Sequence, residues 1–112
     1  MPNVTDVVDL VFADADAAHR QHLATESYAE HMALGSFYED VRDAADALAE
    51  ALIAMDQTLT VEGKPILDRL RESFVTLGEL REVCEDIPGA QNLFDDISST
   101  YLSAIYKLSR LK

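Results

Sequence analysis

The spacing of apolar residues is the sequence feature that most constrains the fold. Apolar side chains recur three or four residues apart in four long segments, and no segment shows the sustained alternation of a β-strand. Glycine and proline mark the breaks, at Gly63 and Pro65 and at the adjacent Pro88 and Gly89. The pattern predicts an all-α, four-helix bundle in a single domain over residues 1–112, with helices at about 4–25, 27–55, 65–87 and 90–111.

Each predicted helix carries one apolar stripe, and together the four stripes form the predicted core. The first two stripes consist of Val4, Val8, Val11, Ala15, Ala18 and His22, and of Phe37, Val41, Ala44, Leu48, Leu52 and Met55. The other two consist of Ile66, Leu70, Phe74, Leu77, Leu80, Cys84 and Ile87, and of Phe94, Ile97, Tyr101, Ile105, Leu108 and Leu111.

The charge balance excludes several classes of partner. The 9 Lys and Arg stand against 21 Asp and Glu, which gives a formal charge of -12. An acidic chain cannot neutralise phosphates, so we expect no direct nucleic-acid binding and no docking on anionic lipid. No apolar run approaches the roughly 20 residues of a membrane span, and the first residues lack the basic region of a secretory signal. A single cysteine excludes an intramolecular disulfide and a cysteine-based zinc site.

The second predicted helix carries a row of acidic residues on one face. The row consists of Glu39, Asp43, Asp46 and Glu50, spaced 4, 3 and 4 residues apart. Its members fall within about 60° of one another, roughly opposite the apolar stripe of the same helix. They therefore face water or another subunit. Because like charges at this spacing repel one another, a bound cation is the alternative to a plain solvated face.

The three histidines extend this acidic row into a recognisable pattern. His19, His31, Asp46 and Glu50 have the arrangement H-x11-H-x14-D-x3-E. This spacing resembles that of the ferroxidase ligands in Dps-type mini-ferritins. The surrounding segments HLATESYAEHMALGSFYEDV, DALAEAL and SSTYLSAIYKLSRLK are similar to small ferritin-like proteins encoded by bacteriophages, most without an assigned function. The resemblance covers about residues 15–55 and 90–112.

The resemblance implies a ferritin-like fold and a metal site shared between two subunits. In the family, one subunit supplies the two histidines, here His19 and His31, and its two-fold mate supplies the carboxylates, here Asp46 and Glu50. The implied metal is iron, or another divalent ion such as zinc, and no catalytic residue beyond the ligands is implied. The implied partner is a second copy of the chain, in a homo-oligomer of two-fold dimers or a larger shell.

Two further residues are secondary candidates for the metal site, namely His22 and Asp43. His22 lies at the centre of the first apolar stripe, whereas His19 lies about 60° from it. On burial alone His22 is the histidine expected inside, as a core residue with a satisfied ring, as a ligand or as a residue that orients a ligand. The family spacing favours His19. Asp16, three residues before His19, is either a solvated acid or an orienting group for that ring.

Helix geometry supports a shared site independently of the resemblance. His31 and Asp46 lie 15 residues apart on one predicted helix, which corresponds to roughly 22 Å, whereas metal–ligand bonds are about 2 Å long. The two residues of one chain therefore cannot bind the same ion. An antiparallel second copy would bring them together around a two-fold axis near Glu39 and Asp40, with Arg42 as the neutralising group.

Two questions stay open at the level of sequence. The extended segment at about 56–64 favours a ferritin-like crossover between the second and third helices, while a sequential up-down bundle is the alternative. For function, the first hypothesis is Fe(II) binding and oxidation, with iron storage or oxidative protection as its purpose. The alternative is a non-catalytic phage accessory or structural protein with the same helices and dimer surface. The expected location is the cytoplasm, of a bacterial host if a phage encodes the chain, with the virion as the alternative.

Overall fold

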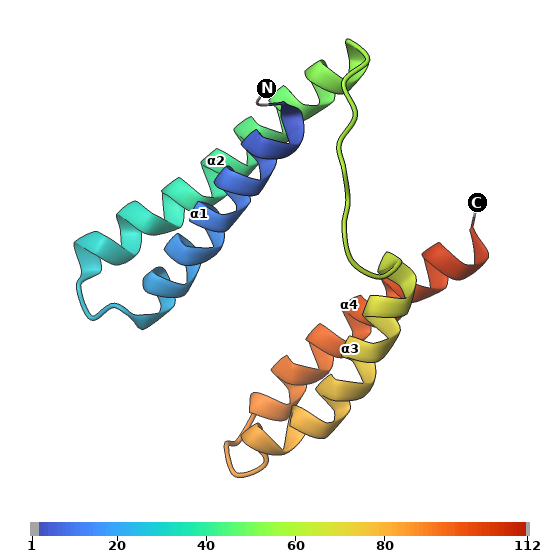
Figure 1. The fold of residues 1–112 in the computed structure, drawn as a ribbon. Helices are drawn as coiled ribbons and strands as arrows, with labels where there is room; N and C mark the ends of the chain where they lie inside the picture. Colours follow the sequence, from blue (N-terminus) through green and yellow to red (C-terminus); the bar gives the residue numbers. More distant parts are fainter. Residues whose placement is uncertain (1–2, 112) are drawn as a thin grey trace. The chain divides into compact units, whose positions relative to one another are not determined.

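The chain is helical throughout its regular structure, as the sequence predicts. The computed structural model describes residues 3–111, and these contain four α-helices and one short 3-10 helix but no strand. The residues at the ends of the predicted domain, at positions 1, 2 and 112, lie outside this range. The elements are α1 (Val4–Ala24), α2 (Tyr28–Ala54), α3 (Ile66–Leu80), η1 (Arg81–Cys84) and α4 (Ala90–Arg110). They form two compact units that divide between Val61 and Glu62, each of them a helical hairpin (Figure 1).

The first hairpin is started by local hydrogen bonds at the beginning of each helix. Asn3 Oδ1 accepts from the backbone N–H of Asp6 at 3.3 Å, and Asp6 Oδ2 accepts from the backbone N–H of Asn3 at 2.8 Å. This reciprocal pair is a capping box, which satisfies backbone donors that a helix start leaves free. At α2, Ser27 Oγ accepts from the backbone N–H of Glu30 at 3.2 Å. These caps explain why α1 and α2 begin within a residue of their predicted starts.

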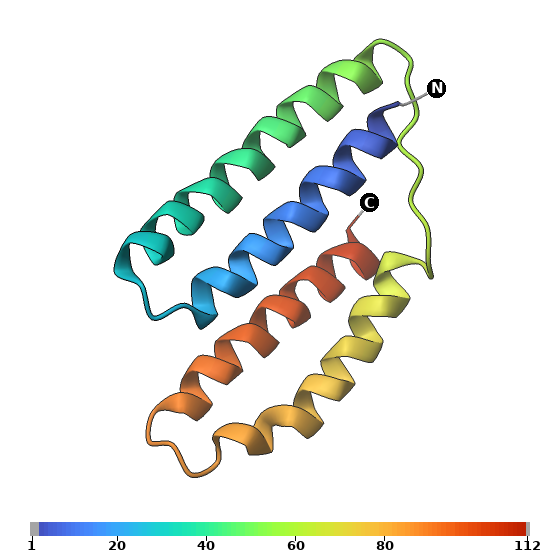
Figure 2. The same cartoon turned by 60° about the vertical axis from the view of Figure 1, so that its left-hand side comes forward.

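The seam between α1 and α2 is lined by small side chains. On α1 the predicted stripe is confirmed, since Val4, Val8, Ala15 and Ala18 are buried. On α2 the buried residues are Ala45 and Ala49. Helices with alanine at the contact can approach closely, and α1 and α2 run side by side from their connecting turn (Figure 2).

The predicted stripe of α2 is only partly correct about the face that packs against α1. Leu52 packs against the buried cluster that contains Val4, and Val41 is half-buried. Phe37, Leu48 and Met55 of that stripe are exposed, at 44%, 44% and 77%. At 100° per residue, the face centred on Ala45 and Ala49 lies roughly 80° around the helix from it. Alanine contributes little to a hydrophobic stripe, so the sequence pattern gave too much weight to the larger apolar residues.

The segment after α2 is extended and returns along the start of α1. Gln57 Oε1 accepts from the backbone N–H of Val4 at 3.1 Å, and Thr5 Oγ1 accepts from the backbone N–H of Thr60 at 2.9 Å. Leu59 packs against the buried cluster that contains Val4. The prediction of an extended connection is therefore confirmed, and its first part belongs to the first hairpin.

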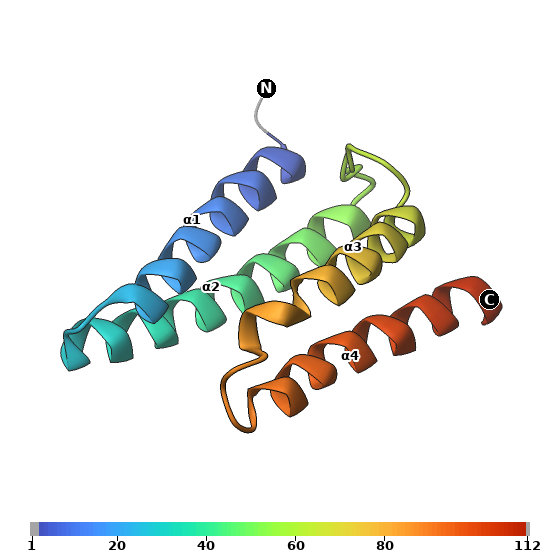
Figure 3. The same ribbon diagram turned by 90° about the horizontal axis from the view of Figure 1, so that it is seen from below.

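The second hairpin consists of α3, η1 and α4, with α4 lying beside α3 (Figure 3). The third predicted helix extended to residue 87, but the α-helix ends at Leu80 and continues only as the 3-10 helix to Cys84. Pro88 disfavours helical backbone at Ile87, because its ring crowds the preceding residue. Gly89 then takes a left-handed φ of 82°, and the N–H of Ala90 donates to the carbonyl of Ile87 at 3.1 Å. Proline followed by a left-handed glycine is typical of a type II turn.

The second hairpin buries less of its apolar surface than the first. Neither α3 nor α4 contains a buried residue, while Cys84 in η1 is buried. Leu70, Phe74 and Leu77 are half-buried. Despite these exposed apolar side chains, no helix within residues 3–111 combines the length and the apolar character needed to cross a membrane.

Candidate functional site

The three histidines and one tyrosine gather at the closed end of the first hairpin. His19 and His22 lie one turn apart on α1, and His31 and Tyr38 come from the facing side of α2. The His22 and His31 rings stack with their centres 3.8 Å apart and their planes 19° apart. The His19 ring stacks on Tyr38 at 4.0 Å and 9°. His22 joins the two stacks edge-on, 6.2 Å from His19 and 5.5 Å from Tyr38.

Two reciprocal hydrogen bonds hold the His22–His31 stack. His22 Nδ1 lies 2.6 Å from the carbonyl oxygen of His31, and His31 Nδ1 lies 2.9 Å from the carbonyl oxygen of His22. A carbonyl oxygen only accepts, so each Nδ1 carries the proton and donates. In the neutral rings each Nε2 therefore keeps its lone pair, which is the arrangement usual for a metal-ligating histidine.

A glycine on α2 makes room for this stack. A Cβ atom at Gly35 would lie 3.0 Å from Cε1 and 3.2 Å from Nδ1 of His22. Real side chains rarely approach so closely, and the His22 ring is held between two helices. Gly35 is therefore part of the histidine cluster although it supplies no donor.

The proposed carboxylate ligands lie elsewhere on α2. Asp46 and Glu50 are exposed, as are Glu39 and Asp43 of the same row. Since α2 is continuous from Tyr28 to Ala54, the 15 residues between His31 and Asp46 separate them by roughly 22 Å. The structure thus brings the three histidines together and keeps Asp46 and Glu50 away from them within one chain.

The donor set fits a divalent metal only if more than one chain contributes. Within residues 3–111 no group of three or more histidine, cysteine, aspartate or glutamate side chains could hold an ion. The near-parallel rings of His22 and His31 cannot both direct in-plane lone pairs at one ion about 2 Å away. Each ring can still offer one Nε2, and Asp46 and Glu50 offer exposed oxygen donors one turn apart. Imidazole with carboxylate suits iron and zinc.

Two neighbouring residues, Asp16 and Arg42, make contacts within the first hairpin. Asp16 accepts from Arg20 Nε at 2.8 Å in an exposed ion pair, which does not involve the His19 ring. The guanidinium carbon of Arg42 lies 6.0 Å from the centre of the Phe12 ring. That distance is typical of a cation–π contact, so Arg42 packs toward α1.

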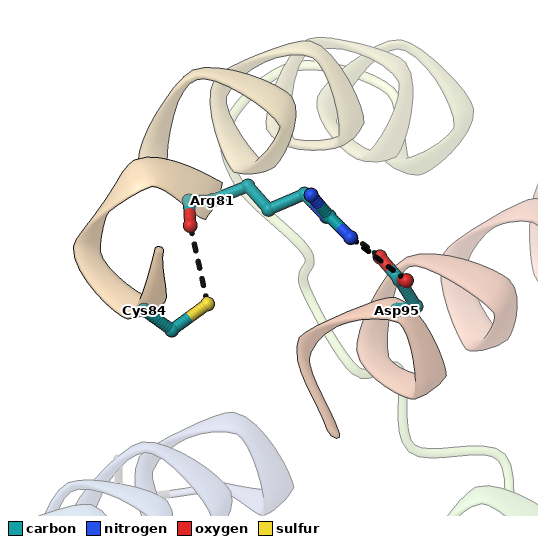
Figure 4. A network of polar contacts seen from close by, with 3 residues as sticks. All are labelled: Arg81, Cys84 and Asp95. Carbon is teal, nitrogen blue, oxygen red and sulfur yellow. Dashed lines mark hydrogen bonds and ion pairs between the residues drawn. The ribbon is translucent and has the colours of Figure 1, made fainter. Parts of the chain in front are cut away.

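The second hairpin has its own polar network, which joins η1 to α4 (Figure 4). Arg81 donates twice to Asp95, from Nε to Oδ1 at 2.9 Å and from the terminal nitrogen to Oδ2 at 3.1 Å. The hydrogen bond from Arg81 lowers the pKa of the Asp95 carboxyl. The thiol of Cys84 donates to the carbonyl of Arg81 at 3.1 Å, which agrees with the expectation of a buried structural cysteine. Nothing in this network resembles a reactive site.

Sequence reasoning missed the roles of Gly35 and of Tyr38 as a ring partner. Their positions held a usable signal, because His31, Gly35 and Tyr38 lie four and three residues apart and so share one face of α2. His19 and His22 share a face of α1 in the same way. What the sequence did not contain was the register in which these two faces meet.

Comparison with known proteins assigns the chain to a protein family. No curated protein and no solved structure matches the chain. A family model described as "Family of unknown function (DUF5856)" matches residues 22–108. That range begins at His22 and covers α2, α3, η1, the three connecting segments and most of α4. Since it spans well over half of the sequence, the chain belongs to the family of unknown function DUF5856.

Proposed function

We propose that the protein is a ferritin-like, Dps-related metal-binding protein that takes Fe(II) as its substrate at a site shared between two copies of the chain. His31 and His19 of one copy, with His22 as the alternative to His19, would bind the ion together with Asp46 and Glu50 of the other. The compartment that goes with this proposal is the cytoplasm, of a bacterial host if a phage encodes the chain.

One observation carries the proposal. A single continuous helix, α2, holds His31 near one end and the exposed pair Asp46 and Glu50 near the other. His31 Nδ1 is engaged by a carbonyl, so its Nε2 remains free for an ion. If two α2 helices pair in antiparallel orientation, His31 of each copy lies beside Asp46 and Glu50 of the other copy. The two-fold axis repeats every contact, so the dimer contains two identical sites.

A pairing of two α2 helices would use the face between His31 and the pair Asp46 and Glu50, which lie within about 100° of one another around the helix. Glu39 lies on this face and is exposed. Its approach to its own symmetry copy would oppose the pairing unless a cation offsets the charge.

The chemistry matches the donors. Carboxylate oxygens are hard donors and imidazole is a borderline donor, so the set accepts Fe(II) and retains the Fe(III) product. Two Fe(II) ions would give one electron each to hydrogen peroxide, which with two protons becomes two water molecules. The role of this chain's residues is to bind the substrate ions and leave a position open for the oxidant.

The decisive experiment uses complementary variants. The histidine variant is His19→Ala/His31→Ala and the carboxylate variant is Asp46→Asn/Glu50→Gln. Each is loaded with Fe(II) without oxygen, peroxide is added, and ferric absorbance is followed. Neither variant alone should oxidise iron faster than buffer. When the two variants are refolded together in equal amounts, half of the dimers contain one copy of each variant. One of the two sites in such a mixed dimer is complete, so about a quarter of the wild-type sites should be recovered.

A charge-matched control is Asp14→Asn/Glu79→Gln, which removes two exposed acids from α1 and α3. This control should oxidise iron like the wild type. Equal absorbance traces for the wild type and both site variants would overturn the proposal, and a strictly monomeric mass in solution would overturn the shared site.

The second candidate function is a non-catalytic helical protein, such as a phage accessory or structural component. The observation that favours it is the closed hydrogen-bonding of the His22–His31 stack, which also suits a purely structural contact. On this alternative, His31→Ala would lower thermal stability without changing metal binding.

A further inference from the structure

We infer that His22 and Gly35 are positioning residues, which fix His31 in the form that has its proton on Nδ1 and its lone pair on Nε2. This inference rests on the proposed function where it treats His31 as a metal ligand. The protonation form itself is a property of the metal-free chain and is testable without any metal.

The proton of the His31 ring has a backbone carbonyl as its acceptor. The carbonyl of His22 belongs to the last turn of α1, where backbone carbonyls have no partner further along the helix. His31 Nδ1 lies 2.9 Å from this oxygen and supplies the missing donor. A ring bound in this way has one favoured neutral form, because moving the proton to Nε2 would leave two acceptors facing each other.

The orientation of the His31 ring is fixed by the His22 ring. The His22 ring covers its face at 3.8 Å and is itself held by the bond from its Nδ1 to the His31 carbonyl at 2.6 Å. Two ring–carbonyl bonds and one stacking contact thus join residues 9 positions apart. His19 differs, since its ring stacks on Tyr38 and no described residue hydrogen-bonds its nitrogens.

The His22 ring requires glycine at position 35. Gly35 sits within a helix without a positive φ, where glycine is intrinsically unfavourable. Glycine leaves room for the His22 ring at this position, because a Cβ atom on residue 35 would lie 3.0 Å from His22 Cε1. Alanine there would push the His22 ring by a few tenths of an ångström and so disturb its stacking on His31.

The test is a long-range proton–nitrogen NMR spectrum of the full-length, metal-free protein at about pH 8. In such spectra Nε2 couples strongly to both ring protons and Nδ1 mainly to one, so the unprotonated nitrogen can be assigned. His22 and His31 should each show an unprotonated Nε2. His19 should show the exchanging mixture of a free imidazole. An unprotonated Nδ1 at His31, or one common pattern for all three histidines, overturns the inference.

Two glycine variants complete the test. Gly35→Ala should change the His31 pattern toward the exchanging mixture and lower the Zn(II) affinity by about 10- to 100-fold, the usual effect of losing a residue that orients a ligand. Gly78→Ala is the control, because a Cβ at Gly78 in α3 meets nothing within 4 Å, and it should leave both readouts unchanged. An unaltered His31 pattern in Gly35→Ala overturns the role of Gly35, and if that variant does not fold, the wild-type spectrum still decides the protonation form.

The Zn(II) titration separates this inference from the proposed function. If Zn(II) causes no change at the His31 nitrogens, the proposed metal site is wrong. The spectrum of the metal-free protein still decides whether His22 and Gly35 fix the form of His31.

Discussion

The two hairpins of this chain pack their helices with different kinds of side chain. The first buries alanine and valine along its seam and closes with a cluster of histidine and tyrosine rings. The second relies on leucine and phenylalanine, and neither of its two long helices buries a residue. Within residues 3–111 the three histidine rings gather in the hairpin whose seam consists of small residues.

The largest expected difference between the hairpins is in the cost of truncating an apolar residue. Val4 is fully buried at 0% exposure, so Val4→Ala should lower the free energy of unfolding by about 2 kcal/mol. Leu77 is half-buried, and Leu77→Ala should cost about 1 kcal/mol, below the range for a core leucine. Urea unfolding measures both values. If Leu77→Ala lowers the free energy of unfolding by about 3 kcal/mol or more, the apolar stripe that contains Leu77 is buried in solution.

The turns of the second hairpin should be sensitive to glycine replacement. Gly89 has a φ of 82°, which costs an L-residue roughly 1–2 kcal/mol. We expect Gly89→Ala to reduce stability by about that amount, as measured by thermal unfolding. Gly78→Ala, within α3 and in open space, should instead raise stability by about 0.5–1 kcal/mol. Equal effects of the two changes would contradict the assigned turn.

The end of α2 offers an opposite, stabilising change in the first hairpin. Asp56 has a left-handed φ of 69°, and the N–H groups of Asp56 and Gln57 donate to the carbonyls of Ile53 and Leu52. This pattern is a Schellman motif, in which glycine is preferred at the left-handed position. Asp56→Gly should raise the unfolding free energy by about 0.5–1 kcal/mol. A loss of stability would show that the Asp56 side chain has a role of its own.

The smallest effect is expected from the exposed ion pair of the second hairpin. Because Arg81 lowers the pKa of Asp95, the folded pKa lies below the unfolded value. The pair therefore stabilises the hairpin above about pH 4 and loses this effect as the pH falls through the folded pKa. Asp95→Asn should be slightly less stable than the wild type at pH 7, and the difference should shrink as the pH falls below about 4. A difference that does not shrink would have to come from another interaction.

Apolar spacing and the Gly and Pro breaks predicted the helix starts well, and the observed helices begin within about a residue of the predicted starts. Helix starts are predictable because they depend on residues a few positions away, as the caps at Asn3 and Ser27 show. The end of α3 was harder to predict, because its apolar spacing continues through η1 to Cys84 while the backbone tightens to a 3-10 helix.

The histidine cluster was only partly predictable. The sequence identified His19, His22 and His31 as residues of interest, and it identified the separation of His31 from Asp46 and Glu50. It did not predict the stack of His22 on His31 or the space left by Gly35. Both depend on how α1 and α2 meet, and side-chain spacing within one helix carries no information on that register.

By itself the sequence determined an all-helical chain, the positions of its helices, the buried stripe of α1 and the outward acidic row of α2, since these follow from local hydrogen bonding and helix periodicity. Only the tertiary structure decided which face of α2 meets α1, and thereby which ring nitrogens are engaged and which are left free. The physical reason is that α2 has an alanine-rich face beside its larger apolar stripe, and close packing against α1 selected the smaller residues.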